Sequence, residues 1–191
     1  MLEVGRGLIG LARFVRTPVV SCDVRPPGAT GDREDFVRAS GTSLPFRDSA
    51  FPLTVAVDVL EHFPRERRHL LVQELFRVTR DMCVIALPYG PAAARGEESY
   101  RRFVSRFLRP SNPWLEEHRT FGLPALGDLN AELPDGWTRT SRGNVNVRLW
   151  WAMRVLSDLV DPRLGLVLLP LALGRPFGET YRTIFVFRRS A

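Results

Sequence analysis

Short hydrophobic runs alternate with segments of helical periodicity through the first half of the chain. This alternation is typical of an α/β protein built on a mostly parallel sheet. Apolar residues at helical spacing predict a helix over 7–15 and a second over 64–79, where Pro64 suits the first turn. The apolar runs themselves predict strands at 2–4, 18–24, 35–38, 53–59 and 82–87.

The second half of the chain has a different character. Residues 91–122 are rich in charge, proline and aromatic side chains, which indicates a lid or insertion more than another strand–helix repeat. We expect a single domain over 1–191, with 91–122 and 148–178 as lid or insert regions. The remaining pattern predicts a short helix at 124–133, a strand at 137–147, apolar helical segments at 149–160 and 164–173, and a closing strand at 180–188.

A length of 191 residues allows one domain to bury a core without disulfides or a structural metal. Cys22 and Cys83 lie far apart, each within an apolar run, so core packing is favoured over a disulfide or a metal pair. Three histidines (His62, His69 and His118) without a C-x-x-C motif give little support to a zinc site. We therefore expect no metal.

The net charge is +6, and all 27 basic residues are arginine. These arginines are scattered along the chain, so we expect no nucleic-acid partner. The densest cluster, Arg65, Arg67 and Arg68, opens the helix expected over 64–79. A solvated helix face is favoured there over a phosphate-binding patch.

The chain begins without the basic stretch and apolar run of a signal peptide. Its longest uncharged run, 164–174, is too short to cross a bilayer as a helix. We therefore expect a cytoplasmic protein with no transmembrane segment. Peripheral contact of this run with lipid stays open, although a buried hydrophobic helix explains it without a membrane.

A glycine-rich loop follows the first predicted strand. Its sequence, Gly5-Arg6-Gly7-Leu8-Ile9-Gly10, lies where a strand leads into a predicted helix, so the backbone can turn tightly and approach an anionic ligand. Asp23 ends the next strand, where a carboxylate can accept hydrogen bonds from two ribose hydroxyls. This pattern fits NAD, FAD and S-adenosylmethionine about equally, and a purely structural glycine turn stays open as well.

Three sequence blocks in order distinguish these cofactors. Leu2-Glu3-Val4-Gly5-x-Gly7, then Gly41-Thr42-Ser43-Leu44-Pro45-Phe46 followed by Phe51, and then Val57-Asp58-Val59-Leu60-Glu61-His62 resemble signature blocks of class I S-adenosylmethionine-dependent methyltransferases. The resemblance covers about residues 1–90 and is closest to the small-molecule branch of that superfamily. It implies methyl transfer from S-adenosylmethionine to a small-molecule acceptor, in a three-layer sandwich. That sandwich has a mostly parallel, seven-stranded-type sheet whose last strand is antiparallel.

The resemblance also assigns a role to each matching position. One group would bind the methionine, ribose and adenine parts of the cofactor, and His62 would lie on the substrate side. The implied cofactor-binding residues are Glu3, Gly5, Gly7 and Gly10 at the methionine end, Asp23 at the ribose, Ser40 and Gly41 at the adenine, and Asp58 and Val59 along the cofactor.

The sequence departs from the family pattern at several places. Ser40 stands where an acidic residue usually contacts the adenine amine, and Pro52 replaces another acidic residue. The third glycine of the loop comes one residue late, and Arg80-Asp81 replaces a Pro-Gly-Gly turn. Such domains also carry a helix and most of the first strand before the loop, so we expect that the N-terminus of this chain is truncated.

Methyl transfer from a sulfonium needs alignment and exclusion of water, and it needs a base when the acceptor must lose a proton. His62 is the candidate base, with packing at a strand–helix junction as the equal alternative. Glu61 is interpreted as a solvated or helix-start residue. For His118 an exposed loop position is favoured, with a reach to the site from the lid as the alternative. Four aromatic residues either line an acceptor pocket or pack the inserted helices onto the sheet: Trp114, Phe121, Trp150 and Trp151.

Two other function classes stay open. A nicotinamide oxidoreductase would share the fold, but the absence of lysine excludes the Tyr-x-x-x-Lys site of short-chain dehydrogenases. A catalytically weak or inactive relative that acts as a binding or scaffold protein is the alternative that Ser40, Pro52 and the short start favour.

Overall fold

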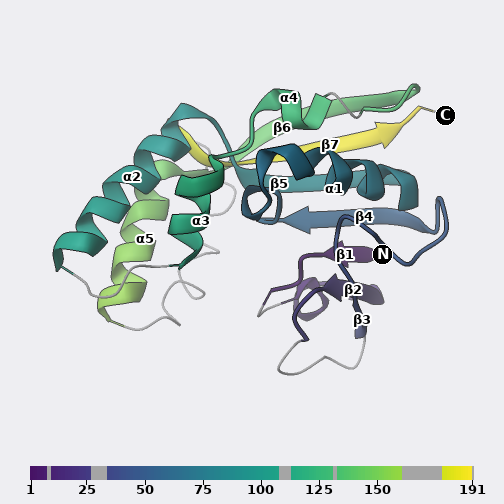
Figure 1. Ribbon diagram of the computed structural model, residues 1–191, viewed down its shortest axis with the longest axis horizontal. Helices are drawn as coiled ribbons and strands as arrows, with labels where there is room; N and C mark the ends of the chain where they lie inside the picture. Colours follow the sequence, from purple (N-terminus) through teal and green to yellow (C-terminus); the bar gives the residue numbers. More distant parts are fainter. Residues whose placement is uncertain (8–9, 27–33, 108–112, 131–132, 161–177, 191) are drawn as a thin grey trace.

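Seven strands form one mixed sheet in the computed structural model, which describes residues 1–7, 10–26, 34–107, 113–130, 133–160 and 178–190. The strand order is β3-β2-β1-β4-β5-β7-β6 (Figure 1). Strands β1 to β5 are mutually parallel, and β7 is antiparallel to both neighbours. The strands are β1 (Leu2–Val4), β2 (Val19–Asp23), β3 (Glu34–Arg38), β4 (Phe51–Val57), β5 (Thr79–Pro88), β6 (Trp137–Asn146) and β7 (Thr180–Arg189).

The expected α/β class, the mostly parallel sheet and the antiparallel last strand are confirmed. Each predicted strand is present, with ends shifted by a few residues at most. The strand order places β1 between β2 and β4, and Val4 lies opposite Cys22 on one side and Ala56 on the other. The carboxyl ends of these three strands therefore meet at one edge of the sheet, where ligands bind in open α/β sheets.

Two groups of helices lie in different places relative to the sheet. α1 (Arg65–Val78) packs on β4 and β5, and the short α4 (Leu126–Asn130) contacts α1. The second group extends beyond the carboxyl ends of the parallel strands (Figure 1). It consists of α2 (Gly90–Phe107), α3 (Pro113–Phe121) and α5 (Val147–Leu159).

The region predicted as a lid over 91–122 is thus largely helical. The apolar segment predicted over 164–173 lies outside the described residues. Among the described residues, no helix is long and apolar enough to cross a bilayer.

The helix predicted over 7–15 is wrong. In its place the described residues form one 3₁₀ turn, η1 (Leu11–Arg13). Gly10 has an extended backbone, with φ −79° and ψ 159°, so a helix cannot run through it. Pro18 then disfavours helical backbone at the residue before it, which leaves space for a single turn.

The core has two parts. The first lies between α1 and the sheet, where Leu71, Leu75 and Phe76 pack against β5 and β7. Cys22 and Cys83 are free thiols in this core, as predicted, and burial raises their pKa to about 11 and to about 12. At roughly 1.5–3 kcal/mol for each large apolar side chain, this cluster supplies much of the stability of the sheet.

The second part of the core attaches the outer helices to β7. The Trp150 ring of α5 stacks on the Tyr181 ring at 3.9 Å between centroids, and Tyr100 of α2 meets Trp150 edge-on. All three rings are buried. The interpretation of the aromatic residues as packing for the inserted helices is therefore confirmed at Trp150.

Arg68 of α1 connects the two groups of helices. Its guanidinium is fully buried and donates to Phe63 O, to Asp128 Oδ2 and to Phe121 O, each at 3.1 Å, and also to Gly122 O. The expectation of a solvated helix face is wrong at this position. One arginine satisfies three backbone carbonyls and a carboxylate, so it holds the end of α3 and the start of α4 against α1.

We predict that Arg68→Met lowers the free energy of unfolding by about 3–5 kcal/mol, because Asp128 and the three carbonyl groups lose their buried hydrogen-bond donor. Arg67→Met is the matched control, since Arg67 is exposed on the same helix, and it should change the free energy of unfolding by less than about 0.5 kcal/mol. Urea denaturation followed by circular dichroism measures both. Equal midpoints for the two variants would contradict the role given to Arg68.

Candidate functional site

The glycine loop leaves the carboxyl end of β1 in a conformation that only glycine adopts easily. Gly5 and Gly7 have φ of 77° and 60°, in the left-handed region. The Gly5 N–H donates to Cys22 O at 2.8 Å, and a Cβ on Gly5 would lie 2.2 Å from Val59 Cγ2. A Cβ on Gly7 would meet nothing within 4 Å. Gly5 is therefore fixed by close packing, while the backbone at Gly7 faces open space.

Two carboxylates hold this loop. Asp23 Oδ2 accepts a hydrogen bond from the Gly7 N–H at 3.0 Å, and its Oδ1 accepts one from the Arg25 N–H at 3.0 Å. The buried carboxylate of Glu3 accepts from the Leu11 N–H at 2.9 and 3.1 Å. Burial raises the pKa of Glu3. Both predicted acidic residues thus lie against the glycine loop, Glu3 within β1 and Asp23 at the end of the neighbouring β2.

A buried ion pair that the sequence analysis missed lies behind the loop. Arg6, between the two glycines, is only 5% exposed, and its guanidinium pairs with Glu34 of β3. Ser21 donates to the same carboxylate at 2.6 Å. A Cβ on Gly10 would come within 3.0 Å of both Arg6 and Glu34, which explains the third glycine of the loop. No local sequence pattern predicts the Arg6–Glu34 pair, because 28 positions separate the two residues.

Ser40 and Gly41 follow β3. Ser40 Oγ lies 2.9 Å from Thr42 Oγ1, within a tight turn. A Cβ on Gly41 would lie 2.7 Å from Leu71 Cδ1 and 3.1 Å from Val4 Cγ1. Core packing against α1 and β1 therefore favours glycine at position 41, because a larger residue would require Leu71 to shift.

Asp58 begins the segment after β4 with a left-handed φ of 52°. Its N–H donates to Ala86 O, and its carboxylate pairs with Arg182 of β7, with Nε 3.0 Å from Oδ1. Burial raises the pKa of Asp58, and the charge of Arg182 opposes this effect. Asp58 therefore joins β4 to the antiparallel part of the sheet, a contact that the sequence analysis did not predict.

The two histidines that the sequence analysis considered lie side by side. His62 ends the short turn η2 (Leu60–His62), and its ring centroid is 5.0 Å from that of His118 in α3. His62 Nδ1 lies 2.7 Å from Glu117 Oε2, and His118 Nδ1 lies 2.8 Å from Glu97 Oε1. His118 is only 4% exposed, so the interpretation as an exposed loop residue is wrong: α3 packs against η2 and buries it.

Glu61 also differs from its prediction. Its side chain is fully buried, and neither carboxylate oxygen has a hydrogen-bond partner among the described residues. Burial raises the pKa of Glu61 well above its usual range, and the nearby charge of Asp58 adds to this effect. The interpretation as a solvated residue is therefore wrong, whereas the helix-start alternative agrees with the position of Glu61 in the first turn of η2. A buried acidic side chain without a partner is costly and needs a specific explanation.

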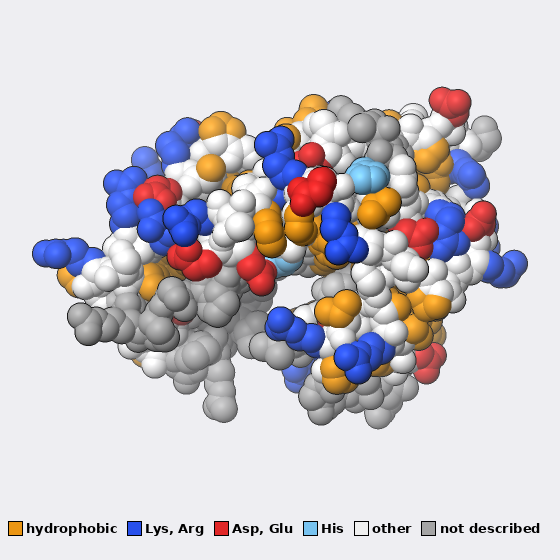
Figure 2. Space-filling view, in the orientation of Figure 1, with side chains coloured by type: hydrophobic (Ala, Val, Ile, Leu, Met, Phe, Trp, Pro, Cys, Tyr) orange, Lys and Arg blue, Asp and Glu red, His pale blue; other side chains and the backbone are white. Residues whose placement is uncertain are grey.

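These groups lie near one edge of the sheet. Figure 2 shows an indentation in the lower half of the molecule, and the part formed by β1, β2 and β3 lies on its right side. The glycine loop and Asp23 lie at the ends of β1 and β2, and His62 lies after β4. The residues predicted for the site are therefore brought to the same edge of the sheet.

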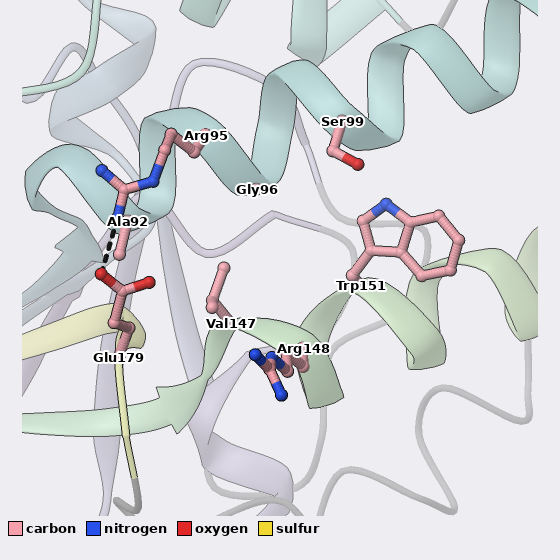
Figure 3. Close-up of a pocket in the computed structure, with 8 residues that line it drawn as sticks. All are labelled: Ala92, Arg95, Gly96, Ser99, Val147, Arg148, Trp151 and Glu179. Carbon is pink, nitrogen blue, oxygen red and sulfur yellow. Dashed lines mark hydrogen bonds and ion pairs between the residues drawn. The ribbon is translucent and has the colours of Figure 1, made fainter.

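A cavity of about 290 Å³ lies between α2 and α5 (Figure 3). It is shallow, and the Arg95–Glu179 ion pair closes one side, with 2.6 Å between the charged atoms. A Cβ on Gly96 would lie 2.6 Å from Val147 Cγ2, so the two helices are already in close contact there. None of the residues predicted for the cofactor or for catalysis lines this cavity, which separates it from the site at the sheet edge.

Sequence comparison identifies relatives of the chain. Residues 2–87 match the model of the methyltransferase domain family. An uncharacterized methyltransferase of Mycobacterium tuberculosis (strain H37Ra) is 40% identical over 111 residues, covering 56% of this chain and 41% of the relative. One from Mycobacterium leprae (strain Br4923) is 30% identical over 150 residues, covering 71% of this chain and 55% of the relative. The chain thus spans about half the length of these relatives.

Solved structures show the same fold. A putative sarcosine dimethylglycine methyltransferase from Galdieria sulphuraria superimposes with a TM-score of 0.59 at 14% identity, covering 99% of this chain and 77% of that protein. Geranyl diphosphate C-methyltransferase from Streptomyces coelicolor A3(2) gives 0.57 at 13% identity, covering 100% and 70%. At such low identity the likeness concerns the fold alone.

The contact between Gly5 and Val59 yields a prediction about the loop. Gly5→Ala should destabilise the protein by about 2–4 kcal/mol, from backbone strain and overlap with Val59 together. Gly7→Ala is the matched control: it introduces the backbone strain but no overlap with another side chain, and it should lower the free energy of unfolding by about 1–2 kcal/mol. Adding Val59→Ala to Gly5→Ala should recover at least about 1 kcal/mol relative to the sum of the single changes. Additive values in urea denaturation would exclude the contact.

Proposed function

We infer that this chain, a class I S-adenosylmethionine-dependent methyltransferase by family and by fold, transfers the methyl group of that cofactor to a small-molecule acceptor beside His62. One observation carries the proposal: the glycine loop, Asp23 and the His62–Glu117 pair lie at the same edge of the sheet. An acceptor bound at this edge would face both the cofactor-binding loop and a candidate base.

The residues of the loop fit S-adenosylmethionine. Bound there, the cofactor would supply an electrophilic methyl group on a sulfonium. Gly7 leaves open space where a side chain would otherwise project, so the backbone allows close approach of a ligand. Each oxygen of Asp23 accepts one backbone N–H, and its remaining lone pairs can accept the ribose hydroxyls. Glu3 fixes the far end of the loop through Leu11.

The other predicted cofactor residues divide into two kinds. Gly10 and Gly41 shape the site because the Arg6–Glu34 pair and Leu71 leave no space for a side chain. Ser40 offers a hydroxyl at the adenine side. Val59 packs on Gly5, and Asp58 sets the direction of the chain after β4. We propose that these residues contact the cofactor mainly through their backbone and by shaping the site, and less through charged side chains.

His62 is proposed as the base that takes a proton from the acceptor. A carboxylate can only accept a hydrogen bond, so Glu117 fixes the proton of His62 on Nδ1. Nε2 is then the basic nitrogen, in the orientation that an assisting carboxylate gives to a catalytic histidine. Removal of a proton raises the nucleophilicity of a hydroxyl or amine acceptor.

Two alternatives make different predictions. The match of residues 2–87 to a methyltransferase family favours methyl transfer over hydride transfer to a nicotinamide. A binding or scaffold protein with the same fold would keep the glycine loop but would not catalyse methyl transfer. Cofactor binding and methyl transfer are therefore measured separately.

Asp23 tests the cofactor site. Asp23→Ala removes charge-assisted hydrogen bonds to the ribose, each worth roughly 1.5–3 kcal/mol, so affinity for S-adenosylhomocysteine should fall at least about tenfold. Asp35→Ala is the matched control, because Asp35 is an exposed aspartate on the neighbouring β3. Isothermal titration calorimetry measures both. Unchanged affinity in Asp23→Ala would show that the loop does not bind this cofactor.

His62 tests the reaction. With methyl-labelled S-adenosylmethionine and a small-molecule extract as the acceptor source, the protein should form a labelled product, and His62→Asn should slow its formation by about 10²–10⁴-fold. Affinity for S-adenosylhomocysteine should stay the same in this variant. His69→Asn, a change of an exposed histidine on α1, is the control. Cofactor binding without any labelled product would favour the scaffold alternative.

A further inference from the structure

Glu61, His62 and His118 form a cluster that the methyl-transfer proposal uses only in part. One ligand-type atom from each of the three residues lies within 4.8 Å of the other two. Glu61 and His62 come from the turn after β4, and His118 comes from α3, so the tertiary fold assembles the cluster. We propose that these three side chains bind a divalent transition-metal ion, of the class that includes Zn²⁺.

The histidines are oriented as metal ligands usually are. Each ring has a carboxylate on Nδ1, Glu117 for His62 and Glu97 for His118, at 2.7 and 2.8 Å. Such carboxylate–histidine pairs fix the tautomer, so that Nε2 carries the lone pair, and they make the ring a stronger ligand. Glu97 is itself held by the Tyr181 hydroxyl at 2.8 Å. A metal in this cluster would therefore be bound through Nε2 of both rings.

Glu61 supplies the independent observation. Its side chain is completely buried and its two carboxylate oxygens have no hydrogen-bond partner among the described residues. Buried carboxylates are normally paired with a cation or coordinate a metal. An ion between Glu61 and the two imidazoles would satisfy this carboxylate.

The surrounding charges also favour a cation. Four carboxylates lie around the two rings, and among the described residues only Asp58 pairs with an arginine, Arg182. Of the other three, Glu97 and Glu117 pair with the histidines, and Glu61 has no hydrogen-bond partner among the described residues. A divalent ion would offset part of this negative charge.

The geometry requires a small contraction. Ligand atoms in a tetrahedral zinc site are about 3.3 Å apart, as bond lengths of about 2.0–2.2 Å dictate. The separations of up to 4.8 Å must therefore shorten by about 1.5 Å. His62 is 34% exposed at its side chain and can turn toward Glu61, whereas the buried His118 stays in place.

Two imidazoles and one carboxylate suit Zn²⁺, Fe²⁺ and their neighbours, and three protein ligands leave a coordination position open. This step of the inference rests on the proposed function: the open coordination position would face the acceptor. A metal ion lowers the pKa of a bound hydroxyl, so it would activate the acceptor in place of the His62 base, whose Nε2 it occupies. The inference thus gives the acceptor side of the site a second mode of activation.

Calorimetric titration of chelator-treated protein with ZnSO₄ tests the site, and the visible spectrum with Co²⁺ reports the ligand geometry. We expect one ion per chain. Glu61→Gln and His118→Asn should each weaken Zn²⁺ binding more than about a hundredfold, and Glu97→Gln by about tenfold, since loss of an orienting carboxylate costs about 10–100-fold. His69→Asn, a change of a histidine outside the cluster, should leave the affinity unchanged.

The substitution of Glu61 by glutamine keeps the size of the side chain and breaks no hydrogen bond of the described structure, so the variant should fold, which circular dichroism checks. Wild-type affinity for Zn²⁺ in Glu61→Gln, or no binding by the wild type, would overturn the metal site. Binding of S-adenosylhomocysteine is measured in the same samples. If the wild-type protein binds S-adenosylhomocysteine but no Zn²⁺, this inference alone is rejected, and if it binds Zn²⁺ but no S-adenosylhomocysteine, the proposed function alone is rejected.

Discussion

The parallel pairing of β1 with β2 and β4 is the constraint on which the site depends. β1 is only three residues long, and it is held because both of its edges are hydrogen-bonded. The register places Gly5, Asp23 and Asp58 within one or two residues of the same sheet edge. A slip by one residue would turn side chains to the opposite face and take the Asp23 carboxylate away from the Gly7 N–H.

The helices beyond this edge add the second half of the site. α3 brings Glu117 and His118 to η2, and α2 brings Glu97 to His118. Their placement depends on the buried donor Arg68 at one end of α3, and on the stack of Trp150 and Tyr181 under α2 and α5. The positions of the acceptor-side residues therefore depend on how these helices pack.

Two arginine–carboxylate pairs connect parts of the sheet that are not consecutive in the chain. Arg6 with Glu34 supports the glycine loop from β3, and Asp58 with Arg182 joins β4 to β7. Arg6–Glu34 is buried, and a buried pair contributes little net stability although removing one partner is costly, so it fixes one arrangement of the strands. Asp58–Arg182 is partly exposed. Glu61, which has no such partner in the described structure, stands out against this pattern.

The sequence by itself determined the α/β class, the strands and the glycine loop with Asp23, because these follow from periodicity and spacing within short segments, while the resemblance to class I methyltransferases implied the place of His62. It misjudged the helix over 7–15, where Gly10 is extended, and it took Glu61, Arg68 and His118 for solvated residues. Burial of a charged side chain depends on which distant segment covers it. His62 and Glu117 are 55 positions apart, and no local pattern encodes such a contact. Only the packing of α3 on η2 decided that these side chains form a cluster.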